Sequence, residues 1–310
     1  MEEVIFCPAC NSVHHRTFVQ TSAMMHSHSH EKYNFDRCED CGLVFLNPRV
    51  SKTELDQFYS AAYLPYRLEE AWGKYASFVK QDQRNIDKAR VKRLKQYHTL
   101  TTHSRILDVG CGKPTFLAAV RNDTPAKLIG IDFTDEGWKN EAQEYRGIDL
   151  RVGEVVDLRG EPPVDVITMW HYLEHDYEPQ AHLRQLLDIS SSQTTLIAEV
   201  PNFESYTRRK FGKHWAGYHT PRHTALYSPS NIEVLMKNSG WKVEQVLTYG
   251  TLDPYTLHWM SRMEQQSINW SDSMEQRFIG YVAGMVLNAP IYKLQKLFSM
   301  GFMTVVARPA

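Results

Sequence analysis

The strand-to-helix turn at residues 106–116 constrains the fold of this chain more than any other segment. An apolar run, ILDV, leads into Gly110-Cys111-Gly112, and the following residues, FLAAVR, have the pattern of a helix. Glycines permit positive φ and let the backbone approach a ligand closely beside a helix N-terminus. Asp132 ends the next apolar run, LIGID, 20 residues beyond Gly112. A carboxylate at that strand end is placed to accept both hydroxyls of a ribose.

Further apolar runs follow the turn at the spacing of an α/β protein. The runs RILDVG, KLIGID, VDVITMW and TTLIAEV alternate with helical stretches, a pattern typical of a Rossmann-like, doubly wound, mostly parallel sheet. A length of 310 residues suggests one large domain with an appendage. We expect a small N-terminal module at 1–50, a helical lid or connector at 51–103, and the cofactor-binding core at 104–310. The chain pattern also predicts helices near 51–59 and 72–97.

Four of the five cysteines form a CxxC…CxxC pattern within the first 41 residues. Two residues between cysteines let both thiolates of a turn point at one metal, and two such turns complete the tetrahedron that Zn²⁺ accepts. The pattern predicts a zinc-ribbon-like module with a closed, structural site. Reduced cysteines without a metal, or an iron–sulfur site, are the alternatives. In the 27-residue gap, His26, His28 and His30 form a polar loop that can bind metal adventitiously. The predicted zinc ligands are Cys7, Cys10, Cys38 and Cys41.

Charge and hydropathy exclude several classes of function. Lys and Arg number 35 against 36 Asp and Glu, a net charge of −1, which gives no support to non-specific nucleic-acid binding. The basic run at 88–95 is therefore interpreted as a solvated helix face. The acidic N-terminus lacks the long apolar stretch of a secretory signal, so a cytoplasmic location is expected. Residues 278–292 are apolar but too short for a bilayer span, and we expect a core or domain-packing helix there, with a membrane contact as the alternative. The sequence does not reveal the oligomeric state.

The segment Asp108-Val109-Gly110-Cys111-Gly112 resembles the first motif of class I S-adenosylmethionine-dependent methyltransferases, an acid followed by Gly-x-Gly. The resemblance implies that both glycines line the methionine part of the cofactor, that Asp108 organises the site near the amino group, and that Asp132 holds the ribose. It further implies cofactor contacts at Glu154, which would meet the adenine amino group, and at Val155 and Trp170.

Two positions depart from related patterns. Pro114 stands where the methyltransferase family commonly has a third glycine, so the loop contour around the methionine carboxylate is expected to differ. Position 115 is Thr, whereas nicotinamide dehydrogenases use Gly-x-Gly-x-x-Gly, which disfavours a dehydrogenase.

Residues 165–175, DVITMWHYLEH, resemble the fourth strand and following loop of a methyltransferase subgroup that includes ubiquinone-biosynthesis O-methyltransferases. In some of these enzymes an acid at the first loop position and a Glu-His pair coordinate a divalent cation. Here that first position is His171, so a catalytic cation held by His171, Glu174 and His175 stays open. A hydroxyl acceptor must lose its proton as it attacks, and histidine has a suitable pKa. We predict His175 or His171 as the general base. The alternative is that Glu174 caps a helix or pairs with an arginine while His175 packs.

Residues 215–223, WAGYHTPRH, resemble the His-x-Pro-Arg-His loop that many of these enzymes insert over the acceptor pocket, here at about 201–230. We predict acceptor contacts from Trp215, Tyr218 and Arg222, with Arg222 as a bidentate clamp for a carboxylate or phosphate. His219 and His223 are candidates to share in base catalysis. The neighbouring basic residues at 208–213 favour an anionic acceptor, unless this is a solvated basic turn.

These patterns predict methyl transfer from S-adenosylmethionine to a small-molecule acceptor. O-methylation of a hydroxylated or anionic natural-product, sugar or quinone-type intermediate is the first choice, with N- or C-methylation next. A zinc module before such a core also resembles enzymes that methylate sugars and other natural-product intermediates. Two alternatives are an RNA- or protein-directed methyltransferase that recruits its target through the zinc module, and a non-catalytic cofactor-binding scaffold, which Pro114 keeps open.

Overall fold

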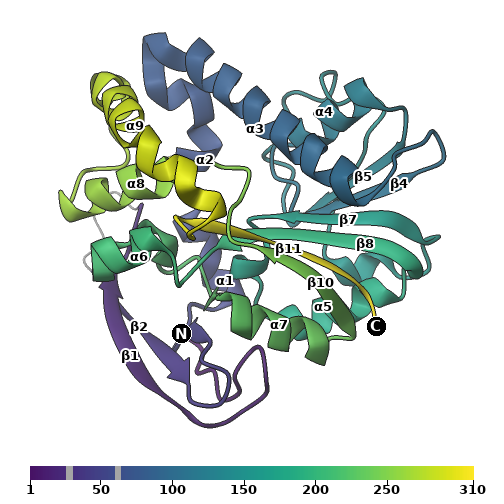
Figure 1. Cartoon of the computed structure of the whole chain (residues 1–310), viewed down its shortest axis with the longest axis horizontal. Coiled ribbons are helices and arrows are strands. Elements are labelled where there is room, and N and C mark those ends of the chain that lie inside the picture. The colour runs from purple at the N-terminus through teal and green to yellow at the C-terminus, as the bar shows by residue number, and fades with distance from the viewer. Residues whose placement is uncertain (26–30, 60–63) are drawn as a thin grey trace.

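The predicted apolar runs form neighbouring strands of one seven-stranded sheet in the computed structural model, which describes residues 1–25, 31–59 and 64–310. The strand order is β10-β11-β8-β7-β4-β5-β6 (Figure 1). Strands β6, β5, β4, β7 and β8 run parallel, whereas β11 is antiparallel to both of its neighbours. The fold is therefore the predicted Rossmann-like α/β arrangement. The strands are β4 (Arg105–Val109), β5 (Lys127–Asp132), β6 (Asp149–Val152), β7 (Val164–Trp170), β8 (Ser190–Pro201), β10 (Trp241–Leu247) and β11 (Phe302–Pro309).

Helices cover both faces of this sheet (Figure 1). Because successive strand residues point to opposite faces, Ile106 packs in the core beneath α3 and α4, whereas Leu107 packs in the core that α5 and α7 cover. The α-helices are α1 (Lys52–Leu55), α2 (Leu64–Arg67), α3 (Ala76–Tyr97), α4 (Thr115–Asp123), α5 (Pro179–Leu187), α6 (Tyr206–Phe211), α7 (Pro229–Asn238), α8 (Tyr255–Gln265) and α9 (Phe278–Tyr292). Short 3₁₀ segments are Asp56–Phe58, Leu68–Tyr75, Val155–Leu158, Leu173–His175, Gly212–His214, Ala216–Tyr218, Glu275–Arg277 and Lys293–Lys296.

The helix predicted at 72–97 begins later than its pattern suggested. Gly73 has φ +52° and ψ −124°, a conformation that no α-helix contains. The chain therefore passes through the 3₁₀ segment Leu68–Tyr75 before α3 starts at Ala76. Likewise, the helix predicted at 51–59 consists of α1 and one 3₁₀ turn.

A second sheet joins the N-terminal region to a distant part of the chain. Its strands are β1 (His15–Ser22), β2 (Lys32–Cys38), β3 (Val44–Leu46) and β9 (Ala225–Leu226), in that order. All the pairings are antiparallel, and Phe45 opposes Ala225 across β3 and β9. Residues 1–50 and the segment expected to cover the acceptor pocket thus share one sheet. His26, His28 and His30 lie outside the described residues.

The C-terminal part forms an aromatic cluster with the segment before α3. Trp72 packs against Trp259 of α8 and Phe278 of α9, with ring centroids 5.5 and 5.9 Å apart. The predicted helix at 278–292 is present as α9, and one of its faces lies in this cluster. None of the helices within residues 1–25, 31–59 and 64–310 combines the length and apolarity needed to cross a membrane.

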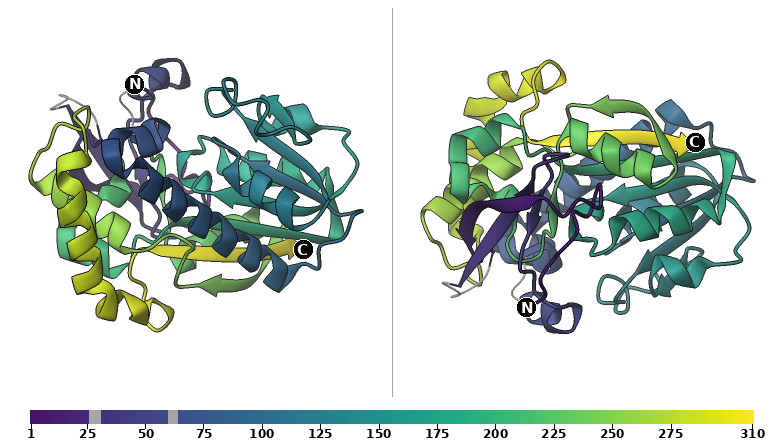
Figure 2. Two further views of the ribbon diagram at one scale, coloured as in Figure 1. Left: turned by 90° about the horizontal axis from the view of Figure 1, so that it is seen from above. Right: turned by 90° about the horizontal axis from the view of Figure 1, so that it is seen from below.

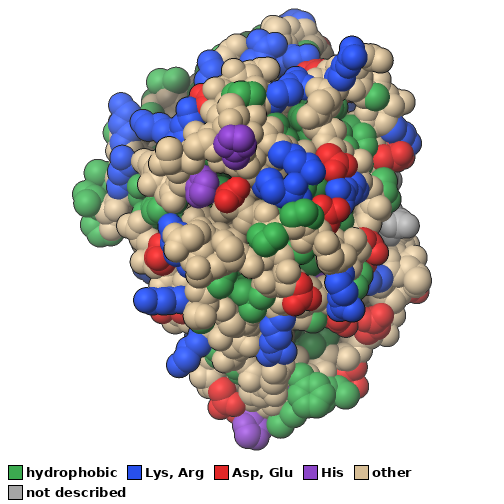
Figure 3. Space-filling model, turned by 90° about the vertical axis from the view of Figure 1, so that its right-hand side faces the viewer, with side chains coloured by type: hydrophobic (Ala, Val, Ile, Leu, Met, Phe, Trp, Pro, Cys, Tyr) green, Lys and Arg blue, Asp and Glu red, His purple; other side chains and the backbone are tan. Residues whose placement is uncertain are grey.

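The basic run at 88–95 is divided between solvent and protein. Lys88, Lys92 and Lys95 are exposed, whereas the guanidinium of Arg90 lies 5.0 Å from the ring of Trp170 and that of Arg93 lies 4.8 Å from the ring of Tyr249. Basic and acidic side chains are intermingled on the face shown in Figure 3.

Candidate functional site

A pocket of about 420 Å³ opens at the carboxyl ends of β4, β5 and β7, the edge where doubly wound sheets bind ligands. Its volume lies within the range of small-molecule sites. A larger hollow of about 780 Å³ lies between α3 and α4, among charged side chains and away from the glycines of the turn. The smaller pocket is the candidate site, because the predicted motif residues converge there. Its lining includes Lys52, Tyr59, Gly110, Gly112, Asp132, Phe133, Gly153, Glu154, Val155, His171, Tyr172, His175 and Asp176.

The glycine turn forms the floor of the pocket. Gly110 and Gly112 have φ values of +70° and +49°, which side chains rarely adopt. A Cβ at Gly110 would lie 2.4 Å from Cδ2 of Tyr172, so only glycine lets this tyrosine pack over the turn. A Cβ at Gly112 would meet no atom within 4 Å. The turn therefore presents bare backbone to the open pocket at Gly112.

The two predicted acids occupy different depths. Asp132 lines the pocket, and its Oδ2 accepts a hydrogen bond of 2.9 Å from the backbone N–H of Gly112. Burial raises the pKa of Asp132. Asp108 lies below the lining, 3% exposed, and accepts a hydrogen bond of 2.6 Å from Thr168. Burial raises the pKa of Asp108 to about 7, although the bond from Thr168 opposes this shift.

Of the other three residues predicted to contact the cofactor, two line the pocket and one does not. Glu154 lines the pocket, caps the 3₁₀ segment Val155–Leu158, and approaches Lys52 with an N–O distance of 3.2 Å. Val155 lines the same wall and is buried. Trp170 is buried at the end of β7, where its ring packs edge-on against Phe116 with centroids 5.3 Å apart. The structure therefore places Trp170 behind the described lining of the pocket.

His171 lies between two buried carboxylates. Its Nδ1 is 3.3 Å from Oε1 of Glu174, and its Nε2 is 3.3 Å from Oε1 of Glu199. Burial opposes a charge on the ring, but the two carboxylates together raise the pKa of His171 to about 9. His171 is consequently a cation at neutral pH and has no lone pair with which to accept a proton there. Its φ of +59° marks strained backbone directly after β7.

His175 has the opposite protonation state. Burial lowers its pKa, and the charge of Glu174 only partly opposes this. The Nδ1 of His175 lies 3.2 Å from the carbonyl oxygen of Arg222 and 3.1 Å from the hydroxyl of Tyr59. A carbonyl oxygen only accepts hydrogen bonds, so the contact with Arg222 favours the tautomer with the proton on Nδ1 and the lone pair on Nε2, whereas in the other tautomer the hydroxyl of Tyr59 donates to Nδ1. His175 is thus a neutral imidazole beside the pocket.

Two further histidines, His219 and His223, lie beside His175 but do not line the pocket. The ring of His223 lies 4.5 Å from that of His175, and its Nδ1 donates to the carbonyl of Gly217 at 2.8 Å. His219 lies 6.0 Å from His175 and has φ +40°. Burial lowers the pKa of both His219 and His223 well below the usual value.

Ligand atoms of Glu174, His175 and His223 lie within 4.8 Å of one another, close enough to hold one metal ion. Glu174 is 2% exposed, and its Oε2 has no hydrogen-bond partner among the described residues. This group differs from the predicted ligands His171, Glu174 and His175. His171 lies between Glu174 and Glu199, and His223 is the third residue of the group.

The residues predicted to bind an acceptor lie in the interior. Arg222 is 1% exposed, and its guanidinium donates to the backbone carbonyls of Phe58, Met24 and Met25 at 2.8 to 3.0 Å. Trp215 and Tyr218 are also buried, and the indole N–H of Trp215 donates to Thr207 at 3.1 Å. In this structure the guanidinium of Arg222 joins the 215–223 loop to two segments, Met24–Met25 and Phe58, and does not line the pocket as a clamp.

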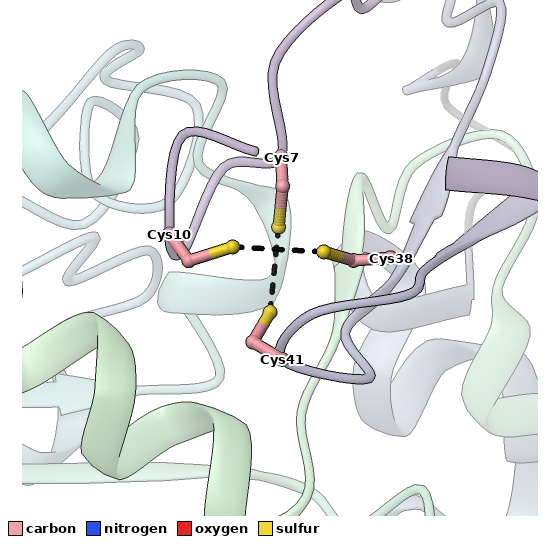
Figure 4. A group of neighbouring side chains, drawn as sticks. All are labelled: Cys7, Cys10, Cys38 and Cys41. Carbon is pink, nitrogen blue, oxygen red and sulfur yellow. Dashed lines mark hydrogen bonds between the residues drawn. The ribbon is translucent and has the colours of Figure 1, made fainter. Parts of the chain in front are cut away.

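The four N-terminal cysteines converge from two similar turns (Figure 4). The fourth residue after the first cysteine of each turn, Asn11 or Gly42, has a positive φ and donates its N–H to that cysteine's carbonyl. The Sγ atoms of Cys7 and Cys41, and those of Cys10 and Cys38, are 3.5 Å apart. Disulfide bonds are much shorter, about 2.0 Å. Four thiolates around Zn²⁺ at about 2.3 Å would lie about 3.8 Å from one another, so the cluster fits a zinc tetrahedron.

Sequence reasoning missed two residues of the site. Glu199 is the charged residue in the apolar run TTLIAEV, and a charge inside such a run was the available signal. It is fully buried and accepts hydrogen bonds from Thr251 and Thr304. Tyr59, which contacts His175, comes from the connector and carries no pattern that separates it from other tyrosines.

Residues 78–246, more than half of the chain, match the model of a family described as "Methyltransferase domain". No curated protein sequence matches the chain. Phosphoethanolamine N-methyltransferase 2 of Haemonchus contortus, in complex with S-adenosyl-L-methionine, is a similar solved structure with a TM-score of 0.54 and 15% identity, over 86% of this chain and 61% of that chain.

Two other solved structures share the fold. One is a complex between the Haloferax volcanii Trm112 methyltransferase activator and a methyltransferase, with a TM-score of 0.50 and 16% identity over 78% of this chain and 97% of that chain. The other is a sarcosine dimethylglycine methyltransferase from Galdieria sulphuraria, with a TM-score of 0.50 and 10% identity over 74% and 87%.

Proposed function

Because this chain belongs to the methyltransferase domain family, and is a class I S-adenosylmethionine-dependent methyltransferase, we propose that it methylates a hydroxyl oxygen of a small-molecule acceptor with His175 as the general base. The single observation that carries the proposal is the neutral His175 at the pocket, with its proton on Nδ1 and its lone pair on Nε2.

The cofactor would lie across the strand ends. The bare backbone of Gly110 and Gly112 suits the methionine part, and Asp132 has lone pairs left for the ribose hydroxyls. Glu154 and Val155 on the adjoining wall suit the adenine. Asp108 supports the turn from below, through Thr168. When bound, S-adenosylmethionine would supply a methyl group from its sulfonium sulfur. The electron pair of the broken S–C bond would stay on that sulfur, which becomes a thioether.

His175 takes the proton from the acceptor hydroxyl as its oxygen attacks the methyl carbon, so no alkoxide has to form in advance. The carbonyl of Arg222 holds the Nδ1 proton and thereby sets the tautomer. Burial lowers the pKa of His175, and the charge of Glu174, which opposes this effect, stabilises the imidazolium that results. At neutral pH, Glu174 and Glu199 favour the charged form of His171, so His175 is the better candidate for the base. The role of His171 is to hold the loop after β7 against β8.

The alternative to His175 as the general base is a divalent-cation site in the same cluster. Glu174 has a buried oxygen without a partner among the described residues, and both His175 and His223 donate Nδ1–H to backbone carbonyls. Ligating histidines commonly have such backbone or carboxylate partners. Glu174, His175 and His223 would then hold the ion, which would polarise the acceptor oxygen.

The N-terminal module would act as a structural support for the acceptor side. Its four thiolates suit a closed zinc site, and its strand β3 pairs with β9, directly after the 215–223 loop. Asn11 bonds to Gln180 of α5, and Asn238 of α7 donates to the carbonyl of Ala9. The module thus fixes the loop that carries His219, Arg222 and His223.

Transfer of radiolabel from methyl-labelled S-adenosylmethionine tests the proposal. The enzyme is offered separate small-molecule, RNA and protein fractions of a cell extract. Label is expected in the small-molecule fraction, and label in RNA or protein alone would overturn the choice of acceptor. Cofactor binding without transfer to any fraction would identify a non-catalytic scaffold.

Turnover assays with the fraction that takes label distinguish the general-base hypothesis from the divalent-cation hypothesis. His175→Gln is expected to lower turnover by about 10²–10⁴ while calorimetry shows unchanged S-adenosylmethionine binding. If His175 is the base, turnover of the native enzyme withstands chelation by EDTA, and His223→Gln retains more activity than His175→Gln. Loss of turnover in EDTA that Mg²⁺ or Mn²⁺ restores, with equal losses in both variants, would assign the cation site instead.

A further inference from the structure

The outward face of α9 and of the 3₁₀ segment that follows it is almost wholly apolar. Each exposed residue from 279 to 291 is apolar or glycine: Ile279, Gly280, Ala283, Val286, Leu287, Pro290 and Ile291. Ile279 and Leu287 expose 70% and 78% of their surface. The apolar stripe continues through Leu294, Leu297 and Phe298. Monomeric soluble proteins rarely expose a contiguous apolar patch larger than a few hundred Å².

The other face of α9 is firmly packed, so the outward face is set by the fold. The ring of Phe278 stacks on Tyr75 with centroids 3.9 Å apart, and Tyr281 packs against Trp72 and Trp259. Figure 2 shows α9 along the outer edge of the molecule, away from the main sheet. A helix packed on one side normally carries polar residues on the other, whereas α9 carries Val, Leu and Ile there.

The charged residues that follow α9 in the sequence are all basic, whereas the acidic residues Asp272 and Glu275 precede it. From Phe278 to the end of the sequence there is no Asp or Glu. Lys293 and Lys296 are exposed beside the stripe. Lys210 of α6 is exposed as well, and α6 lies next to the end of the stripe because the N–H groups of Tyr206 and Thr207 donate to Ser299 and Met300. A basic margin therefore borders the apolar stripe at its C-terminal end.

We propose that this surface, formed by Phe278–Tyr292 and residues 293–298 with Lys210, docks on an anionic lipid bilayer. An interfacial helix lies in the membrane plane, with apolar side chains among the acyl chains and lysines at the phosphates. A second copy of the chain fits less well, because protein interfaces average about one hydrogen bond per 100–200 Å² and the outward residues of α9 offer no side-chain donor or acceptor. With 15 residues, α9 lies on the bilayer and does not cross it.

Vesicle flotation with the full chain tests this proposal. Binding is expected to phosphatidylcholine vesicles that contain phosphatidylglycerol, and much less to phosphatidylcholine alone. The double variant Leu287→Ser/Leu297→Ser should lower partitioning at least about tenfold, because two largely exposed leucines lose their apolar transfer. Val13→Ser, which alters an exposed valine in the N-terminal module, is the matched control and should bind like the native chain. Calorimetric binding of S-adenosylmethionine reports whether each variant is folded.

The basic margin is tested separately. Lys293→Gln and Lys296→Gln should each weaken binding to the anionic vesicles about fivefold, without changing the weak binding to neutral vesicles. Failure of the native chain to float with anionic vesicles would overturn the proposal. So would a dimer in sedimentation analysis that the double variant dissociates, because a second copy would then cover the stripe.

Discussion

The buried carboxyl of Asp108 should make this protein less stable as the pH rises. Asp108 is 3% exposed, and its side chain accepts a hydrogen bond from the hydroxyl of Thr168. Burial raises its pKa from 3.8 to about 7. Since the folded-state pKa is the higher one, the protonated form is favoured by folding. The contribution is fully present below about pH 4 and is lost progressively as the pH rises to about 7.

The size of the loss follows from the shift. A difference of about three pKa units corresponds to about 4 kcal/mol, a large part of the stability of a typical domain. Asp108→Asn keeps the shape of the side chain and the acceptor for Thr168 but cannot ionise. The variant should therefore gain about 4 kcal/mol relative to the native chain between about pH 4 and pH 7, whatever its stability at the acidic end.

The assay is urea unfolding of both proteins without cofactor, at a series of pH values across this window. The quantity compared is the difference between the two free energies of unfolding, so that all other titrating groups cancel. Thr168→Val removes the hydrogen bond that lowers the pKa of Asp108, so the loss of stability should continue to a higher pH and become larger in total. A difference between native and Asp108→Asn proteins that stays constant from about pH 4 to pH 7 would refute the reasoning.

Three further changes test other parts of the structure. Gly110→Ala should destabilise the chain by about 1–3 kcal/mol more than Gly112→Ala in urea unfolding, because both have positive φ but only the first places a Cβ 2.4 Å from Tyr172; equal losses would contradict the clash. Arg222→Ala should cost about 3 kcal/mol or more, since three backbone carbonyls lose their donor, and Arg222→Lys should not restore it; a loss of acceptor affinity at unchanged stability would instead support a clamp. Removing zinc with a chelator, or the substitution Cys38→Ser, should lower both the zinc content measured by atomic emission and the melting temperature, because a structural site contributes its binding energy to folding. An unchanged melting temperature after zinc loss would contradict a structural role.

The strands were predictable because their signal is local. Between its charged ends the run KLIGID is apolar, as expected for a strand with helices on both faces, and β5 occupies Lys127–Asp132. The glycine turn was predictable for a similar reason, because positive φ restricts the residue type at single positions. Gly73 shows the limit of this approach, since its conformation delays the start of α3 without interrupting the polar pattern around it.

The histidine cluster could be predicted only in part. The sequence predicted His171 and His175 equally as candidate bases. In the structure the pKa of His171 is raised and that of His175 is lowered, and Glu199 contacts only His171. Glu174 and His175 lie 49 and 48 positions before His223 in the sequence, and the three residues converge only when the loop after β7 meets the 215–223 loop. Arg222 looked like an anion clamp because its residue type suits that role, but its carbonyl partners come from Met24, Met25 and Phe58.

By itself, the sequence determined the fold class, the glycine turn and the grouping of the four cysteines into one cluster, because each depends on residue types at short, regular spacings. Only the tertiary structure decided which histidine is neutral, which arginine is buried and which face of α9 meets solvent. The physical reason is that pKa, burial and exposure depend on what packs against a side chain. Those neighbours come from distant segments, as when β9 completes the sheet of the cysteine module.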